Sequence, residues 1–134
     1  MKWLDTNIIL RYLTGDDPVK ARACLTLFQR VRQGDEELTT SDVIVAEVTY
    51  VLTSQYQLDH AEIAARLLPL LVLPGLKLHR KRVVLRALEI YAQYRRLDFE
   101  DALSAAQMEH LGVREILSYD TDFDRVPGLI RQEP

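Results

Sequence analysis

Hydrophobic positions along the chain follow two alternating patterns. Short apolar runs predict strands, and longer segments whose apolar residues recur with helical spacing follow them. This alternation predicts an α/β domain with a short, mostly parallel central sheet. The expected strands cover residues 2–4, 37–40, 76–78, 115–118 and, at an edge, 129–131. The expected helices cover residues 6–10, 16–34, 43–56, 59–71, 83–94 and 98–112.

The composition is that of a globular protein. The 134 residues are 48% apolar and 28% charged, which excludes disordered and fibrous classes. The lone Cys24 cannot form an internal disulfide and fits a reducing compartment. No targeting signal is present, and the longest apolar stretch, residues 67–73, is far too short to cross a membrane. We therefore expect one domain over residues 1–134, located in the cytoplasm.

Charge is unevenly distributed along the chain. The 17 basic and 20 acidic residues give a net charge of −3, which by itself argues against nucleic-acid binding. Residues 77–96, however, hold seven Lys and Arg against one acid. This segment, with tyrosines interleaved, suits contact with an RNA backbone, and a solvated helix face is an equal alternative. The candidate RNA-binding residues are Arg80, Lys81, Arg82 and Arg86.

Two acidic residues of the first half occupy positions where a carboxylate needs an explanation. Asp5 ends an apolar strand and opens a helix. There it either caps the helix or stands at the sheet edge where open parallel sheets build their sites. Glu47 shares one face of its expected helix with Val43 and Val51, so we expect it to point towards the core. A buried carboxylate needs a metal, a polar pocket or a cation, and a structural ion pair with Arg11 is the alternative to a functional role.

The second half of the chain holds further candidate acids. Asp101 shares a helix face with Ala105, which favours function over a capping box with Asp98. Asp120 directly follows the strand over 115–118, and we expect it at the same sheet edge as Asp5. The pattern does not decide between Asp120 and Asp122, and a solvated acidic turn is the alternative for both.

Together these acids predict a site for divalent cations. Two carboxylates at strand ends and two on helices can converge at one edge of the sheet, where their mutual repulsion requires positive charge. Oxygen-only ligands suit Mg²⁺ or Mn²⁺ rather than zinc. Metal-assisted hydrolysis of a phosphodiester is the chemistry that such a cluster supports.

Four segments that contain these acids resemble the motifs of PIN-domain nucleases, in the family's order. They are MKWLDTNIIL at 1–10, AEV at 46–48, FEDAL at 99–103 and SYDTDFDRVPG at 118–128. The chain's size is most similar to that of the VapC toxins of bacterial toxin–antitoxin pairs.

The resemblance implies a three-layer α/β/α fold and Mg²⁺- or Mn²⁺-dependent endoribonuclease activity. It also implies a homodimer that a VapB-type antitoxin inhibits. The residues that match the family's catalytic and metal-binding acids are Asp5, Glu47, Asp101 and Asp120, with Asp122 as a further candidate metal ligand, and those that match its supporting polar positions are Asn7 and Ser118.

Three other functions compete with a toxin nuclease. One is a PIN-domain nuclease of RNA processing that has no antitoxin. Another is a non-catalytic module that binds RNA or a protein. A phosphatase with an aspartate nucleophile often carries a second acid two residues later, and Asn7 at that position counts against it.

Overall fold

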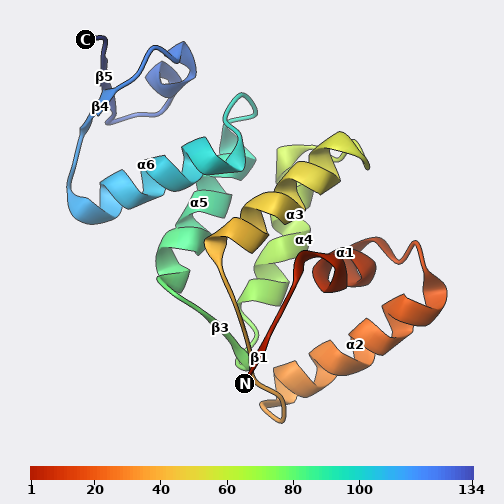
Figure 1. Cartoon of the computed structure of the whole chain (residues 1–134). Helices are drawn as coiled ribbons and strands as arrows, with labels where there is room; N and C mark the ends of the chain where they lie inside the picture. The colour runs from red at the N-terminus through yellow and green to blue at the C-terminus, as the bar shows by residue number, and fades with distance from the viewer.

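The computed structural model describes residues 1–134, and their helices and strands alternate as the hydrophobic pattern predicts (Figure 1). No helix combines the length and apolar character that crossing a membrane requires. The strands are β1 (Lys2–Trp3), β2 (Leu38–Thr40), β3 (Leu76–Leu78), β4 (Glu115–Leu117) and β5 (Ile130–Gln132). The helices are α1 (Thr6–Thr14), α2 (Pro18–Gln33), α3 (Asp42–Ser54), α4 (His60–Leu71), α5 (Lys81–Gln93), α6 (Phe99–Leu111) and the short 3-10 helix η1 (Thr121–Arg125).

Four helices begin at side chains that bind their free amide groups. Asp17, Ser41, Asp59 and Asp98 each accept a hydrogen bond from the amide three residues later, over 3.1, 3.4, 2.9 and 2.9 Å. Such caps satisfy amides that have no partner inside the helix. They set the starts of α2, α3, α4 and α6, and α6 carries one of the candidate acids in its first turn.

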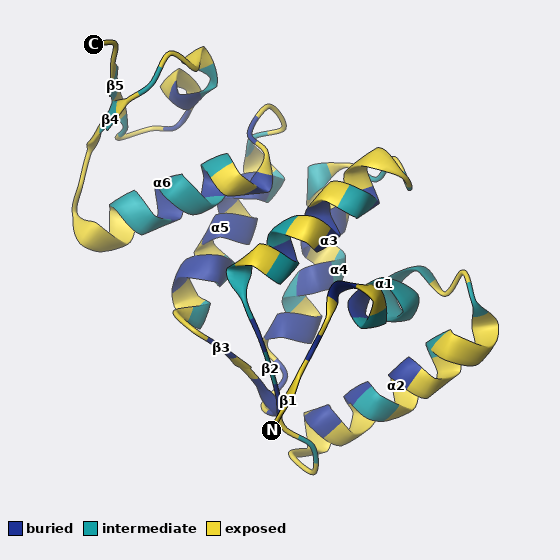
Figure 2. Cartoon of the chain, in the orientation of Figure 1, coloured by how far each residue is buried: buried dark blue, intermediate teal, exposed yellow.

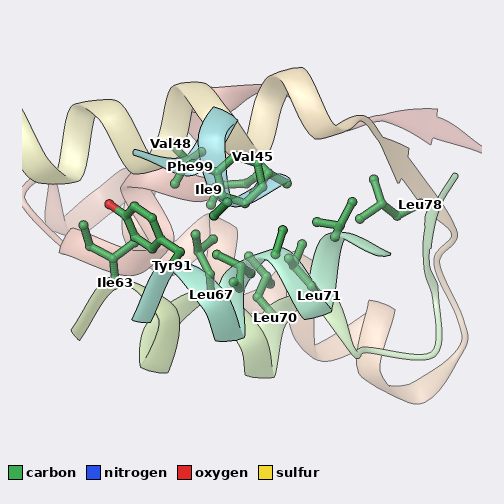
Figure 3. Packing of buried hydrophobic residues seen from close by; sticks show 14 of the residues in the cluster. Ile9, Val45, Val48, Ile63, Leu67, Leu70, Leu71, Leu78, Tyr91 and Phe99 are labelled. Carbon is green, nitrogen blue, oxygen red and sulfur yellow. The ribbon is translucent and has the colours of Figure 1, made fainter. Parts of the chain in front are cut away.

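One apolar core joins most of these elements. It comprises 29 buried residues, and Figure 3 shows how several helices contribute to it. Ile9 of α1, Val48 of α3 and Phe99 of α6 pack above Leu67 of α4 and Tyr91 of α5. Colouring by exposure shows the same arrangement, with buried faces on α4 and α5 and exposed ones on α2 (Figure 2). The N-terminal halves of α1, α3 and α6 are therefore held together by shared packing.

The strands confirm the predicted α/β class and are all parallel. They form a three-stranded sheet of order β1-β2-β3 and a separate two-stranded sheet, β4-β5. Parallel pairing places the carboxyl ends of β1, β2 and β3 at one edge, from which α1, α3 and α5 start.

The expectation that Asp120 shares a sheet edge with Asp5 is wrong for the single chain. β4 and β5 lie beyond α6, apart from the three-stranded sheet (Figure 1). The physical reason is the packing of the C-terminal unit, residues 115–132. Phe123 and Val126, 5% and 9% exposed, belong to the apolar core and hold this unit against the rest of the chain.

Gly75, directly before β3, lies against the end of α2 and the loop that follows it. Its amide donates to the carbonyl of Val31 over 3.1 Å, and its carbonyl accepts from the amide of Leu38 over 2.8 Å. A Cβ at this position would lie 2.3 Å from the carbonyl oxygen of Glu36 and 2.7 Å from that of Val31. Backbone atoms cannot move aside as a side chain can, so this position requires glycine.

We predict that Gly75→Ala lowers the free energy of unfolding by about 2–3 kcal/mol, the cost of overpacking a rigid site. The matched control is Gly15→Ala, where no atom lies within 4 Å of the added Cβ and only the φ of +64° is unfavourable. That control should cost only about 1 kcal/mol. Urea unfolding followed by circular dichroism measures both, and an equal or smaller loss for Gly75→Ala would contradict the prediction.

Candidate active site

Asp5 stands at the carboxyl edge of the three-stranded sheet. The strand before it is fixed by two hydrogen bonds, from the Leu4 amide to the Thr39 carbonyl at 2.8 Å and from Thr40 Oγ1 to the Leu4 carbonyl at 3.0 Å. Asp5 occupies the N-cap position of α1 with extended backbone, yet its side chain makes no capping hydrogen bond. The capping role that the sequence also suggested is therefore not used, and the exposed carboxylate is free for another role.

Glu47 lies next to the start of α1 rather than in the core. Its carboxylate accepts a 2.7 Å hydrogen bond from Thr6 Oγ1. The expectation that Glu47 points towards the core is wrong: the side chain is exposed, because α3 buries Val45 and Val48 instead. The alternative, an ion pair with Arg11, is not formed either, because Arg11 of α1 pairs with Asp16.

Thr6 is a site residue that the sequence analysis missed. It is buried, follows Asp5 directly and orients Glu47, so one short segment positions two of the candidate acids. One signal could have identified it. Thr6 is a polar residue in the first turn of α1, one helical turn before the buried Ile9.

Asp101 lies in the first turn of α6 and is partly buried. Its amide donates to the capping carboxylate of Asp98 over 2.9 Å. Burial raises the pKa of Asp101 to about 6, and the nearby charges and hydrogen bonding of Asp98, together with the charge of Asp120, add to the rise. Carboxylates gather here without a compensating cation, which is the electrostatic setting that favours a bound metal ion.

Asp120 and Asp122 lie at the turn that follows β4, in different surroundings. The Asp120 amide donates to Ser118 Oγ over 3.0 Å, and the Asp120 carboxylate accepts from the amide of Asp122 over 2.9 Å, capping η1. Asp122 lies 3.9 Å from the guanidinium of Arg125. Asp120 thus has no cationic partner, whereas Asp122 has one.

The structure brings the candidate acids together in pairs. Glu47 is tied through Thr6 to the segment of Asp5, and Asp101 lies within electrostatic range of Asp120. No group of three acidic, histidine or cysteine side chains in the single chain has the spacing to hold a metal ion. Asn7, expected to support the acids, lines a separate hollow of about 330 Å³ beside Arg11.

The four candidate RNA-binding residues divide into free and engaged groups. Arg80 and Arg82 are exposed at the start of α5, next to the carboxyl end of β3. Lys81 donates to the carbonyl of Leu76, and burial lowers its pKa. Arg86 pairs with two glutamates of α5 and α6, both within 3.1 Å. Only Arg80 and Arg82 therefore present unpaired charge at the sheet edge that carries Asp5.

The candidate site thus combines parallel strands with acids that follow strands, Asp5 and Asp120, and acids on helices, Glu47 and Asp101. This is an α/β protein with a carboxylate-rich site. The model of the PIN domain family matches residues 2–129, and the chain belongs to that family. It is also similar to the VapC ribonuclease of Aquifex aeolicus (strain VF5), with 24% identity over 126 residues that cover 94% of this chain and 92% of that relative. The resemblance identified from the four acidic motifs is thus confirmed.

We predict that Asp101→Asn stabilises the metal-free protein at alkaline pH. Above about pH 6 the folded protein holds a charged carboxylate at an unfavourable position, whereas the unfolded chain, with a pKa near 3.8, ionises freely. Removal of that charge should raise the melting temperature at pH 8 in EDTA by about 4 °C, on the order of 1 kcal/mol after solvent screening.

The gain should shrink as the pH falls through 6 and vanish below about pH 4, where Asp101 is protonated in both states. Differential scanning calorimetry across this range measures it. Asp59→Asn is the control, because asparagine caps α4 as well as aspartate does and should leave the melting temperature unchanged. A gain that does not vary with pH would show that the effect is not electrostatic.

Proposed function

We propose that this protein is a divalent-metal-dependent endoribonuclease that acts as a VapC-type toxin and is neutralised by a cognate VapB-type antitoxin. One observation carries the proposal. The chain forms ten salt bridges, and none involves Asp5, Glu47, Asp101 or Asp120. In a PIN-domain chain, four motif acids left without a basic partner are available for metal ions and solvent.

The donor chemistry of these residues fits Mg²⁺ or Mn²⁺. Carboxylate oxygens are the ligands that both ions prefer. Burial and the neighbouring carboxylates of Asp98 and Asp120 raise the pKa of Asp101, so a cation bound beside it would relieve the repulsion. Asp5, Glu47, Asp101 and Asp120 would hold the ion, with Asp122 as a further ligand. When bound, it supplies a more acidic water and stabilisation of charge at phosphorus.

The protein's own groups have supporting roles in this proposal. The Thr6 hydroxyl donates to Oε2 of Glu47 and thereby fixes the orientation of the carboxylate, whose other oxygen is left to bind an ion. Ser118 holds the backbone at Asp120 and thereby sets the start of η1. Asn7 remains a proposed supporting residue on the exposed side of α1.

The proposed partners follow from the relative named a VapC ribonuclease. They are an RNA substrate, a VapB-type antitoxin and a second copy of the chain, with action in the cytoplasm. A PIN-domain nuclease of RNA processing would share the metal site and the RNA substrate. An antitoxin reading frame beside the gene, and growth arrest that this antitoxin relieves, distinguish the toxin from that alternative.

We predict that Asp5→Asn and Asp101→Asn each reduce RNA cleavage by at least about 100-fold, the usual scale for loss of a catalytic group. The assay is cleavage of total cellular RNA by the purified protein in Mn²⁺, with EDTA as the metal-free arm and mapping of the cut ends. Asp120→Asn should have a comparable effect, and Asp122→Asn a smaller one, because Arg125 already neutralises Asp122.

Asp59→Asn is the matched control for this series and should cleave at the wild-type rate. Circular dichroism establishes that every variant is folded. Wild-type rates in both Asp5→Asn and Asp101→Asn would overturn the assignment of the site. Failure of the wild-type protein to cleave any RNA in Mn²⁺, or in Mg²⁺ used in its place, would favour a non-catalytic binding module.

We predict that Arg80→Ala with Arg82→Ala weakens RNA binding, whereas Arg86→Ala does not. The first two side chains carry exposed, unpaired charge, and Arg86 is already neutralised by Glu89 and Glu109. Each lost phosphate contact should lower the slope of log K against log salt by about 0.7. Fluorescence anisotropy with a labelled single-stranded RNA in EDTA measures the slope, and an equal loss in Arg86→Ala would contradict the prediction.

A further inference from the structure

The outer edge of β1 has no partner strand in the single chain. The amides of Lys2 and Leu4 donate to β2, over 3.2 Å to Glu37 and 2.8 Å to Thr39. Because successive residues of a parallel strand bond to opposite sides, the amide and carbonyl of Trp3 point away from β2. The Trp3 side chain is 59% exposed. β1 is thus a strand edge that lacks a neighbour, although it leads directly into Asp5.

The outer edge of β4 is unpaired in the same way. Its bonds to β5 use the Arg114 carbonyl, which accepts from Ile130 at 2.8 Å, and the Ser118 amide, which donates to Gln132 at 3.0 Å. The same alternation leaves the backbone groups of Glu115 and Leu117 directed outward. Leu117, at 71% exposure, lies on a face that no other element covers.

Exposed apolar side chains are concentrated around β1 and in the C-terminal part of the chain. Twelve large hydrophobic residues are exposed, and seven of them lie on or beside β1 or between residues 111 and 130. Uncovered edge strands with apolar side chains pair readily with other chains. The seven are Met1, Trp3, Leu111, Val113, Leu117, Tyr119 and Ile130.

Pairing of these two edges within one chain would break existing packing. The C-terminal unit, residues 115–132, is anchored to the core by Phe123 and Val126, and it lies beyond α6 from β1 (Figure 1). Moving β4 onto its own β1 would withdraw both anchors. A second copy can bring its β4 to this β1 with the fold of each chain unchanged, and twofold symmetry satisfies both edges of both chains.

We propose that two copies of this chain exchange their C-terminal units, so that β4 of one copy pairs in parallel with β1 of the other. The combined sheet has the order β3-β2-β1-β4-β5, with its last two strands from the partner. Asp120 of the partner subunit then follows the strand beside Asp5, at the same edge. Each nuclease site is therefore shared between the copies, a conclusion that rests on the proposed function.

Residues 111–115 connect α6 to β4 and lead the C-terminal unit away from its own three-stranded sheet. All five are exposed, and Gly112 ends α6 in the left-handed conformation with a φ of 72°. Asp5 and Glu47, by contrast, stay in one copy, because Thr6 joins their segments.

Complementation between inactive variants tests the exchange. Asp5→Asn and Asp120→Asn chains with different affinity tags are co-expressed, and the mixed dimers are isolated by two successive affinity steps. One site of each mixed dimer then holds both intact aspartates, and we expect about half of the wild-type cleavage rate. Mixed dimers as inactive as either parent would overturn the proposal.

The matched control pairs Asp5→Asn with Glu47→Gln. Both substitutions fall in the part of the site that one copy supplies, so neither site of the mixed dimer is intact and no activity should return. Recovery in this control would show that Asp5 and Glu47 come from different copies and would also overturn the proposal.

Crosslinking provides a second test that does not depend on RNA cleavage. In a Cys24→Ala background, chains with Trp3→Cys are co-expressed with chains that carry Leu117→Cys and treated with a short bis-maleimide. A covalent dimer of the two different chains is expected, and Val19→Cys, exposed on α2, should replace Leu117→Cys without giving this product. Absence of the mixed product, or a monomeric wild-type protein in light scattering, would overturn the exchange even if cleavage itself is never observed.

Discussion

The hydrogen bond from Thr40 to the carbonyl of Leu4 is the interaction on which the candidate site depends. It is buried and joins the ends of β1 and β2 where each strand gives way to a helix. Asp5 and Thr6 follow at once on one side, and α3 with Glu47 begins two residues later on the other. The Thr6–Glu47 bond then ties the two helices together. Two acids distant in sequence are thus placed by a few bonds at one sheet edge.

Much of the fold could be predicted, because the starts of helices and the positions of strands depend on residues that are close together in the sequence. Helix starts follow from capping side chains such as Asp98, and strand positions follow from short apolar runs. The division into two sheets could not be predicted, because strand pairing is a choice among distant edges. Here the burial of Phe123 and Val126 in the core decides which strands pair. The hydrophobic pattern of the sequence does not show where these two side chains pack.

The places of the candidate acids on strands and helices could be predicted better than their positions relative to one another. Asp5, Asp101 and Asp120 do occupy a strand end, a first helical turn and the turn after a strand, as expected. Glu47 was assigned to the wrong face because Val43 and Val51 suggested an apolar surface, whereas α3 buries the stripe that begins at Val45. The role of Thr6 was missed because one hydroxyl in a helix leaves no pattern in the sequence.

The unpaired edge of β1 has a consequence for how activity depends on the concentration of the protein. If each catalytic centre is complete only when two chains contribute residues to it, the number of complete centres at low abundance rises with the square of the protein concentration. At low rates of synthesis nearly all copies would then remain inactive single chains. Activity would begin only above a threshold set by the dimer's dissociation constant, so the architecture itself would limit activity to concentrations at which two chains meet.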